Sequence, residues 1–105
     1  MTLDEYQTKA AETAVYPRNE RWGLIYSALG LASEAGEYAG KVKKLVRDHV
    51  WSRETSMKEL GDVLWYVAAC ARDMGYTLEE VAQANLDKLG DRKQRGVLGG
   101  NGDER

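Results

Sequence analysis

The sequence predicts an all-α fold, an antiparallel four-helix bundle-like arrangement, on three observations. Apolar residues recur at alternating intervals of three and four, which is the helical period, along most of the chain. Capping-box patterns, in which Ser or Thr is followed three residues later by Glu, precede several of these segments. No segment shows the two-residue alternation of a strand. At 105 residues the chain fits one domain.

The first expected helix begins with a capping box, Thr2 to Glu5, and ends near Val15, just before the only proline, Pro17. The second is the most strongly patterned segment and is expected to run from about residue 24 to residue 47 or 48. Its apolar residues follow an unbroken three-and-four spacing, which is typical of a helix packed in a bundle: Leu24, Ala28, Leu31, Ala35, Tyr38, Val42 and Leu45.

The third helix is expected to begin near Ser52 or Ser56 and to end at Gly75. Its apolar stripe consists of Met57, Leu60, Leu64, Val67, Ala71 and Met74. A further capping box, Thr77 to Glu80, begins the fourth helix, whose pattern decays from Gly90 onward. We therefore expect residues 1–95 to form the folded domain and residues 96–105 to form a flexible, glycine-rich C-terminal tail.

Composition excludes several classes of protein. With a net charge of −2 and 30% charged residues, the chain lacks the basic surplus of a protein that binds nucleic-acid polymers. Its single cysteine, Cys70, rules out an internal disulfide framework and fits a reducing compartment. The N-terminal residues lack the layout of a signal peptide, and no apolar run approaches the length of a membrane span. A cytoplasmic protein without membrane partners is expected.

Two acidic pairs, Glu34 with Glu37 and Glu59 with Asp62, carry the functional hypothesis. Each pair is spaced by three residues and therefore shares one helix face. Either pair alone is commonly just a solvated surface, with Glu37 and Lys41 forming a weak ion pair. If the second and third helices pack together, however, all four carboxylates converge, and they then require a cation or raised pKa values. An all-oxygen set without a nearby histidine favours Mg²⁺ or Mn²⁺ over zinc.

Glycines and basic residues lie close to these acids in the sequence. Each glycine inside a helix costs about 1 kcal/mol relative to alanine, so a group of four suggests that another helix or a ligand approaches the backbone: Gly30, Gly36, Gly40 and Gly61. Two groups of polar residues follow at helical spacing, Lys41 and Lys44 in the second helix and Asn85, Lys88 and Arg92 in the fourth. They serve either solubility and helix capping or the binding of phosphate groups beside Mg²⁺.

Taken together, these motifs resemble the MazG-like nucleotide pyrophosphohydrolases. The resemblance is carried by Glu34-x-x-Glu37 within residues 29–37, by Glu59-x-x-Asp62 within residues 58–66, and by Asn85-x-x-Lys88-x-x-x-Arg92. It covers most of residues 3–95. The double acidic motif in this context is much more specific than either acidic pair alone.

The resemblance implies a Mg²⁺-dependent hydrolase that cleaves nucleoside or deoxynucleoside triphosphates between the α and β phosphates, releasing a monophosphate and pyrophosphate. It implies that all four acids are metal ligands and that one of them, with Glu37 preferred, orients the attacking water. It further implies phosphate contacts from Lys41, Lys44, Lys88 and Arg92, a sugar or phosphate contact from Asn85, and a homodimer or homotetramer.

Three alternatives stay open at this point. The substrate could be another pyrophosphate, such as phosphoribosyl-ATP or a guanosine alarmone, or the chain could be a non-catalytic helical module that binds a partner through its apolar stripes. The nucleobase is also open. Trp22, Tyr26, Trp51 and Trp65 could stack on any base, although aromatic residues at helical spacing more often belong to the core.

Overall fold

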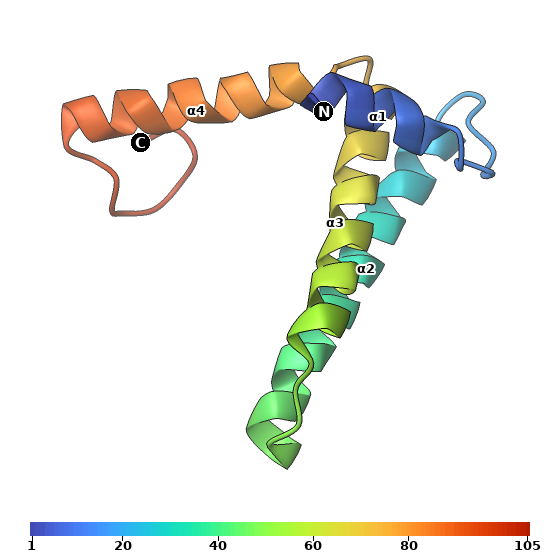
Figure 1. The fold of residues 1–105 in the computed structure, drawn as a ribbon. Helices are drawn as coiled ribbons and strands as arrows, with labels where there is room; N and C mark the ends of the chain where they lie inside the picture. The colour runs from blue at the N-terminus through green and yellow to red at the C-terminus, as the bar shows by residue number, and fades with distance from the viewer.

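The computed structural model describes residues 1–105 and contains four α-helices and no strand, which confirms the predicted all-α fold. The helices are α1 (Leu3–Ala11), α2 (Trp22–Asp48), α3 (Arg53–Asp73) and α4 (Leu78–Arg95). The two longest, α2 and α3, form an antiparallel hairpin (Figure 1). Helix α1 crosses the open end of this hairpin, and α4 leaves the same end at a steep angle, contacting α1 and α3 but not α2.

The hairpin is closed by a short turn with well-defined ends. His49 adopts a left-handed conformation, with φ of 56°, and so terminates α2. Ser52 then caps α3, because its side-chain oxygen accepts a hydrogen bond from the Thr55 amide at 3.1 Å. The sequence therefore reverses direction within a few residues, which brings the acidic motif of α2 alongside that of α3.

Helix α1 is shorter than predicted and ends at Ala11 instead of near Val15. The Thr13 hydroxyl donates to the Ala10 carbonyl at 2.8 Å, and the Trp65 indole Nε1 of α3 donates to that carbonyl and to the Thr13 hydroxyl. These hydrogen bonds satisfy the carbonyl of Ala10 at the end of the helix, so the chain can leave the helical path there. It then carries Tyr16 into the structure, where its ring stacks on Tyr26 with centroids 4.6 Å apart.

An ionic cluster at the end of α3 fixes this connection. The Asp73 side chain is 3% exposed and accepts hydrogen bonds from the Tyr16 hydroxyl at 2.6 Å and the Arg18 Nε at 2.7 Å. Burial acts to raise the pKa of Asp73, but the hydrogen bonds from Tyr16 and Arg18 outweigh it and lower the pKa. The connection between α1 and α2 is thus pinned to α3, well away from the acidic motifs.

The end of α3 and the start of α4 follow the sequence pattern closely. Gly75 has a positive φ of 86° and ends the third helix as predicted. Thr77 and Glu80 form the predicted capping box in both directions. Helix α4 continues through Gly90 to Arg95, and Gly96, with φ of 73°, terminates it. None of the four helices combines the length and apolarity that a membrane crossing requires.

A single chain leaves most of its apolar side chains in contact with solvent. Only five hydrophobic residues are buried: Tyr16, Ala68, Ala69, Ala71 and Leu78. The predicted stripe of α3 is largely open, since Met57 is 64% and Leu60 is 50% exposed. The Cα radius of gyration is 16.3 Å, whereas a compact domain of this length has a radius of about 13 Å.

Candidate metal centre

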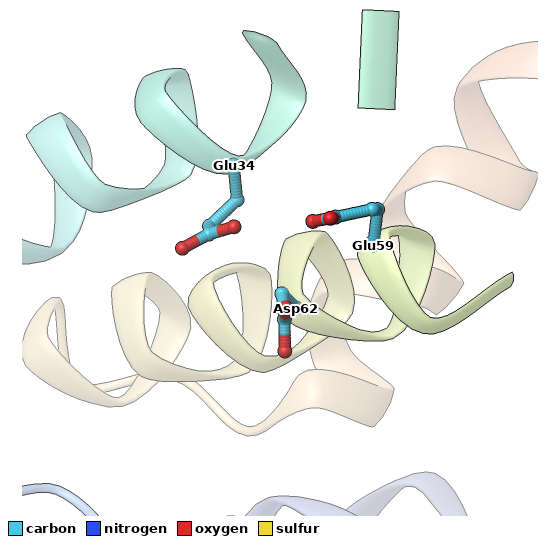
Figure 2. A group of neighbouring side chains, drawn as sticks. All are labelled: Glu34, Glu59 and Asp62. Carbon is cyan, nitrogen blue, oxygen red and sulfur yellow. The ribbon is translucent and has the colours of Figure 1, made fainter. Parts of the chain in front are cut away.

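Three carboxylates from the two acidic motifs meet between α2 and α3. Glu34 extends from α2 and Glu59 from α3 into the space between the helices, with Asp62 one turn further along α3 (Figure 2). One carboxylate oxygen from each residue can be chosen so that all three lie within 4.8 Å of one another. Glu34 and Glu59 are half-buried and Asp62 is exposed, so the cluster opens to solvent on one side. The antiparallel hairpin is what brings the two motifs together.

Burial raises the pKa of the Glu34 carboxyl, and the negative charges of Asp62, Glu59 and Glu37 raise it further. One cation lies nearby, because the Lys41 Nζ is 3.9 Å from Glu59 Oε1. At that distance the lysine offsets the charge of one acid and leaves the other two without a close partner. The cluster therefore carries a surplus of negative charge that an added cation would neutralise.

The donor set fits a hard divalent cation. Mg²⁺ and Mn²⁺ prefer carboxylate oxygens and retain several waters, which suits three acids that open to solvent on one side. The only histidine, His49, belongs to the turn that closes the hairpin and is absent from this group. The raised pKa of Glu34 is the second sign of fit, because burial and then the neighbouring negative charges both disfavour its ionised form, and a bound cation would favour that form.

Glu37, the fourth predicted acid, is not part of the group of three. It is exposed on α2, one helical turn beyond Glu34, and it is near enough for its charge to contribute to the raised pKa of Glu34. It therefore lines the edge of the cluster.

The two predicted lysines of α2 lie between the acids and the turn of the hairpin. Lys41 is paired with Glu59, and both Lys41 and Lys44 line an open groove of about 360 Å³. The groove is completed by the turn and the start of α3, including Trp51 and Thr55. Anions in this groove would meet two lysines and also one acid, Asp48, which is itself paired with Arg47.

The three polar residues of α4 lie elsewhere within one chain. Helix α4 runs away from the hairpin (Figure 1), and none of its basic residues forms an ion pair with an acid of the cluster. Asn85 is exposed, whereas Lys88 and Arg92 are both paired with Asp103 in the segment that follows α4. One chain thus presents an acidic group and a basic group in separate places.

The four helix-interior glycines differ in whether another part of the chain packs against them. A Cβ at Gly30 would lie 2.0 Å from Tyr66 Cε1, so the Tyr66 ring packs directly on the backbone of α2. This confirms the predicted close approach at Gly30, one turn before Glu34. At Gly36, Gly40 and Gly61 no atom beyond the adjacent residues and the local helix backbone lies within 4 Å of an added Cβ.

The four aromatic candidates for base stacking lie in different surroundings. Trp65 is held by hydrogen bonds to α1 and its connection, and Tyr26 is stacked on Tyr16. Trp22 lines a separate apolar hollow with Ile25 and Leu29. Of the four, Trp51 alone lines the groove with Lys41 and Lys44.

Sequence reasoning missed two residues near these groups. The charge of Asp62 adds to the effect of burial in raising the pKa of Tyr6, a residue of α1. Asp103 lies in a non-helical segment, where no periodicity indicates its contact with α4. A long-range contact from irregular structure gives no signal in a single sequence.

Comparisons with known proteins agree with the motifs. The sequence profile of the MazG nucleotide pyrophosphohydrolase domain matches residues 26–97, a range that contains the four predicted acids and the five predicted phosphate- or sugar-binding residues. The chain is also similar to the Gene 37 protein of Mycobacterium phage L5, at 46% identity over 114 aligned positions that cover all of both proteins. No solved structure gives a significant match.

Proposed function

Because the chain belongs to the MazG nucleotide pyrophosphohydrolase domain family, we propose that it hydrolyses nucleoside or deoxynucleoside triphosphates to the monophosphate and pyrophosphate with the help of Mg²⁺. The observation that carries the proposal is the convergence of Glu34, Glu59 and Asp62 between α2 and α3. Such a cluster is electrostatically unfavourable by itself, because burial and then the charges of its neighbours raise the pKa of Glu34. A bound cation offsets this cost.

Glu34, Glu59 and Asp62 hold the metal ion in this account. When bound, Mg²⁺ screens the negative charge of the polyphosphate and lowers the pKa of water. Glu37 orients the attacking water, which its exposed position beside Glu34 would permit. The groove residues Lys41 and Lys44 contact the phosphates, and both are within one continuous surface with the cluster through the Lys41–Glu59 pair.

The chain is proposed to work as a homodimer or homotetramer. Its accessible surface is 7834 Å², while a compact monomer of this mass exposes about 5,900 Å². The excess of about 2,000 Å² exceeds the roughly 800 Å² that each partner contributes to a standard interface. Apolar side chains on both hairpin helices supply the surface, for example Leu29 at 67% and Met57 at 64% exposure.

A second copy would also bring the acidic cluster of one chain close to the polar residues of α4 in another. Within one chain Lys88 and Arg92 pair with Asp103 and not with the acids of the cluster, and α4 does not contact α2, which carries Glu34. In an assembly these residues would complete the binding of phosphate and sugar at a neighbouring cluster. Sedimentation of the purified protein should give a dimer or tetramer. Leu60→Asp on the open face of α3 should shift the protein towards smaller oligomers or monomers. A monomer at micromolar concentration would contradict the proposed assembly.

The activity is tested by incubating the protein with Mg²⁺ and a panel of ribo- and deoxyribonucleoside triphosphates. The expected products are pyrophosphate and the corresponding monophosphate, identified by chromatography, with no activity in EDTA. Phosphoribosyl-ATP and a guanosine tetraphosphate belong in the same panel, because turnover of one of these alone would redirect the proposal to that substrate. Absence of turnover with every compound would contradict it.

The role of Glu37 is tested separately. If Glu37 orients water, Glu37→Gln should lower kcat while the affinity for Mn²⁺ changes little. If it is instead a fourth ligand, the same variant should lower both quantities together. Calorimetric titration of Mn²⁺ alongside steady-state kinetics distinguishes these outcomes, since Mn²⁺ takes the same oxygen ligands as Mg²⁺.

A further inference from the structure

The segment that follows α4 turns back onto the basic face of that helix. Gly96, Gly100 and Gly102 all have positive φ angles, a conformation that other residues rarely adopt, and they let residues 96–105 curl beneath the end of α4 (Figure 1). The Arg105 guanidinium fastens the curl by donating to the carbonyls of residues 97, 98, 99 and 102. Arg95 donates in turn to a main-chain oxygen of Arg105.

This fold places one carboxylate on two cations of the basic stripe. Asp103 Oδ1 lies 2.9 Å from Lys88 Nζ and 3.1 Å from an Arg92 guanidinium nitrogen, and that nitrogen also donates to the Asp103 carbonyl at 2.7 Å. Every side-chain hydrogen bond of Arg92 therefore goes to residue 103. The hydrogen bond from Lys88 and then that from Arg92 lower the pKa of Asp103, so it is ionised at neutral pH.

The ion pairs of Asp103 with Lys88 and Arg92 are of a kind that another anion can replace. Arg92 is 7% exposed in its side chain, but Asp103 is 74% and Lys88 is 42% exposed, so water and ions reach the anionic partner freely. Exposed ion pairs contribute little to stability because solvent screens them. A polyphosphate carries several negative charges and accepts bidentate hydrogen bonds from arginine, so it competes well against a single carboxylate.

We propose that residues 96–105 form an autoinhibitory strap in which Asp103 occupies Lys88 and Arg92 as a stand-in anion, and that a polyphosphate displaces it on binding. The inference rests on the proposed function in one respect, namely that the displacing anion is the substrate's phosphate chain. The apparent affinity for substrate is then the intrinsic affinity multiplied by the fraction of protein in the open state. Neutralising Asp103 should remove that reduction.

The test uses the full chain and inorganic tripolyphosphate as the probe, in EDTA so that no metal contributes. Calorimetric titration should give about two- to tenfold tighter binding to Asp103→Asn than to the natural protein. Glu104→Gln is the matched control, because it removes the same charge from the neighbouring exposed residue and should bind tripolyphosphate as the natural protein does. Adding Lys88→Ala to Asp103→Asn should remove the gain.

Limited trypsin digestion gives an independent readout of strap opening. Cleavage after Arg95 releases the strap, and it should accelerate in the natural protein when tripolyphosphate is added. In Asp103→Asn it should be fast without the probe. Equal or weaker tripolyphosphate binding by Asp103→Asn would overturn the inference. That result would not bear on whether the protein hydrolyses nucleotides. If instead no nucleotide is hydrolysed but Asp103→Asn binds tripolyphosphate more tightly, the proposed function is contradicted and the autoinhibitory strap is supported.

Discussion

The acidic cluster between α2 and α3 and the basic stripe of α4 both gather like charges, yet the chain treats them in opposite ways. Glu34, Glu59 and Asp62 have one lysine nearby at 3.9 Å, and the pKa of Glu34 is raised. Lys88 and Arg92 instead share a carboxylate at 2.9 and 3.1 Å, and the pKa of that carboxyl is lowered. In the first group one lysine pairs with only one of three acids, whereas in the second group a single carboxylate pairs with both cations.

The difference separates two kinds of binding. Charges left unbalanced favour a ligand from outside, so the acidic cluster gains directly from a cation. Cations already paired with a carboxylate bind an outside anion by exchange, so an anion at Lys88 and Arg92 must first displace Asp103. In this account the metal site is always available, whereas access to the basic stripe is controlled by the chain itself.

The largest expected effect comes from removing one acid of the cluster. Glu34→Gln should abolish measurable Mn²⁺ binding and lower nucleotide turnover by about 100-fold or more, since even outer partners of metal ligands cost 10- to 100-fold. The matched control is Glu54→Gln, an exposed glutamate of α3 outside the group, which should leave both quantities unchanged. Because repulsion within the cluster is relieved, metal-free Glu34→Gln should be at least as stable as the natural protein. Loss of stability would show that the acids are structural.

A change in the spacing of the hairpin should have the next largest effect. In Gly30→Ala the new Cβ would lie 2.0 Å from the Tyr66 ring, so α2 and α3 must separate or the ring must move. The free energy of unfolding should fall by about 1–3 kcal/mol, as for other overpacked sites. Mn²⁺ affinity should fall with it, because Glu34 is one turn away from Gly30. Denaturant unfolding and Mn²⁺ titration measure the two effects.

Gly36→Ala is the counterpart of this variant within the acidic motif. No atom beyond the adjacent residues and the local helix backbone lies within 4 Å of the added Cβ. In an isolated chain the substitution should therefore stabilise α2 by about 0.5–1 kcal/mol. In the proposed oligomer a second copy can occupy that space, and the variant would then weaken association. Unfolding measured over a range of protein concentrations distinguishes the two, because only the oligomer makes stability depend on concentration.

The smallest effects concern pH, and the two regions should differ in sign. The folded-state pKa of Glu34 is raised above 4.5, so in the metal-free protein its contribution to stability is full below pH 4.5 and is lost as pH rises through the raised value. The folded-state pKa of Asp103 is lowered below 3.8, so its contribution is present above pH 3.8 and is lost as pH falls through the lowered value.

Unfolding of metal-free Glu34→Gln and of Asp103→Asn, each compared with the natural protein across pH 3 to 7, checks both signs. The difference in the free energy of unfolding between Glu34→Gln and the natural protein should appear above pH 4.5. The corresponding difference for Asp103→Asn should disappear below pH 3.8. Parallel curves for all three proteins would contradict the comparison.

Much of the fold was predictable from local signals. The capping box at Thr77 and the terminating Gly75 correspond to the ends of α4 and α3, because both are short-range features. The three-and-four spacing located α2 and α3, and hence the approach of Glu34 to Glu59 and Asp62. Periodicity does not say what covers an apolar stripe, however, and Leu60 and Leu64 of α3 stay 50% and 42% exposed in one chain.

The parts that could not be predicted depend on contacts distant in the sequence. Helix α1 ends early because Trp65, more than fifty residues away, binds the carbonyl of Ala10. The direction of α4, and with it the separation of Asn85 from the acids, is set by packing on α1 and α3. Asp103 reaches Lys88 through a glycine-rich turn whose course no helical pattern reports.

The central claim is that the cluster on α2 and α3 is a site for a hard divalent cation. It is tested most directly by growing crystals with Mn²⁺ and collecting anomalous diffraction. The account predicts an anomalous peak within coordination distance of carboxylate oxygens of Glu34, Glu59 and Asp62, absent from crystals of Glu34→Gln. A cluster free of Mn²⁺ in the natural protein at millimolar metal, or a Mn²⁺ peak elsewhere that persists in Glu34→Gln, would contradict it.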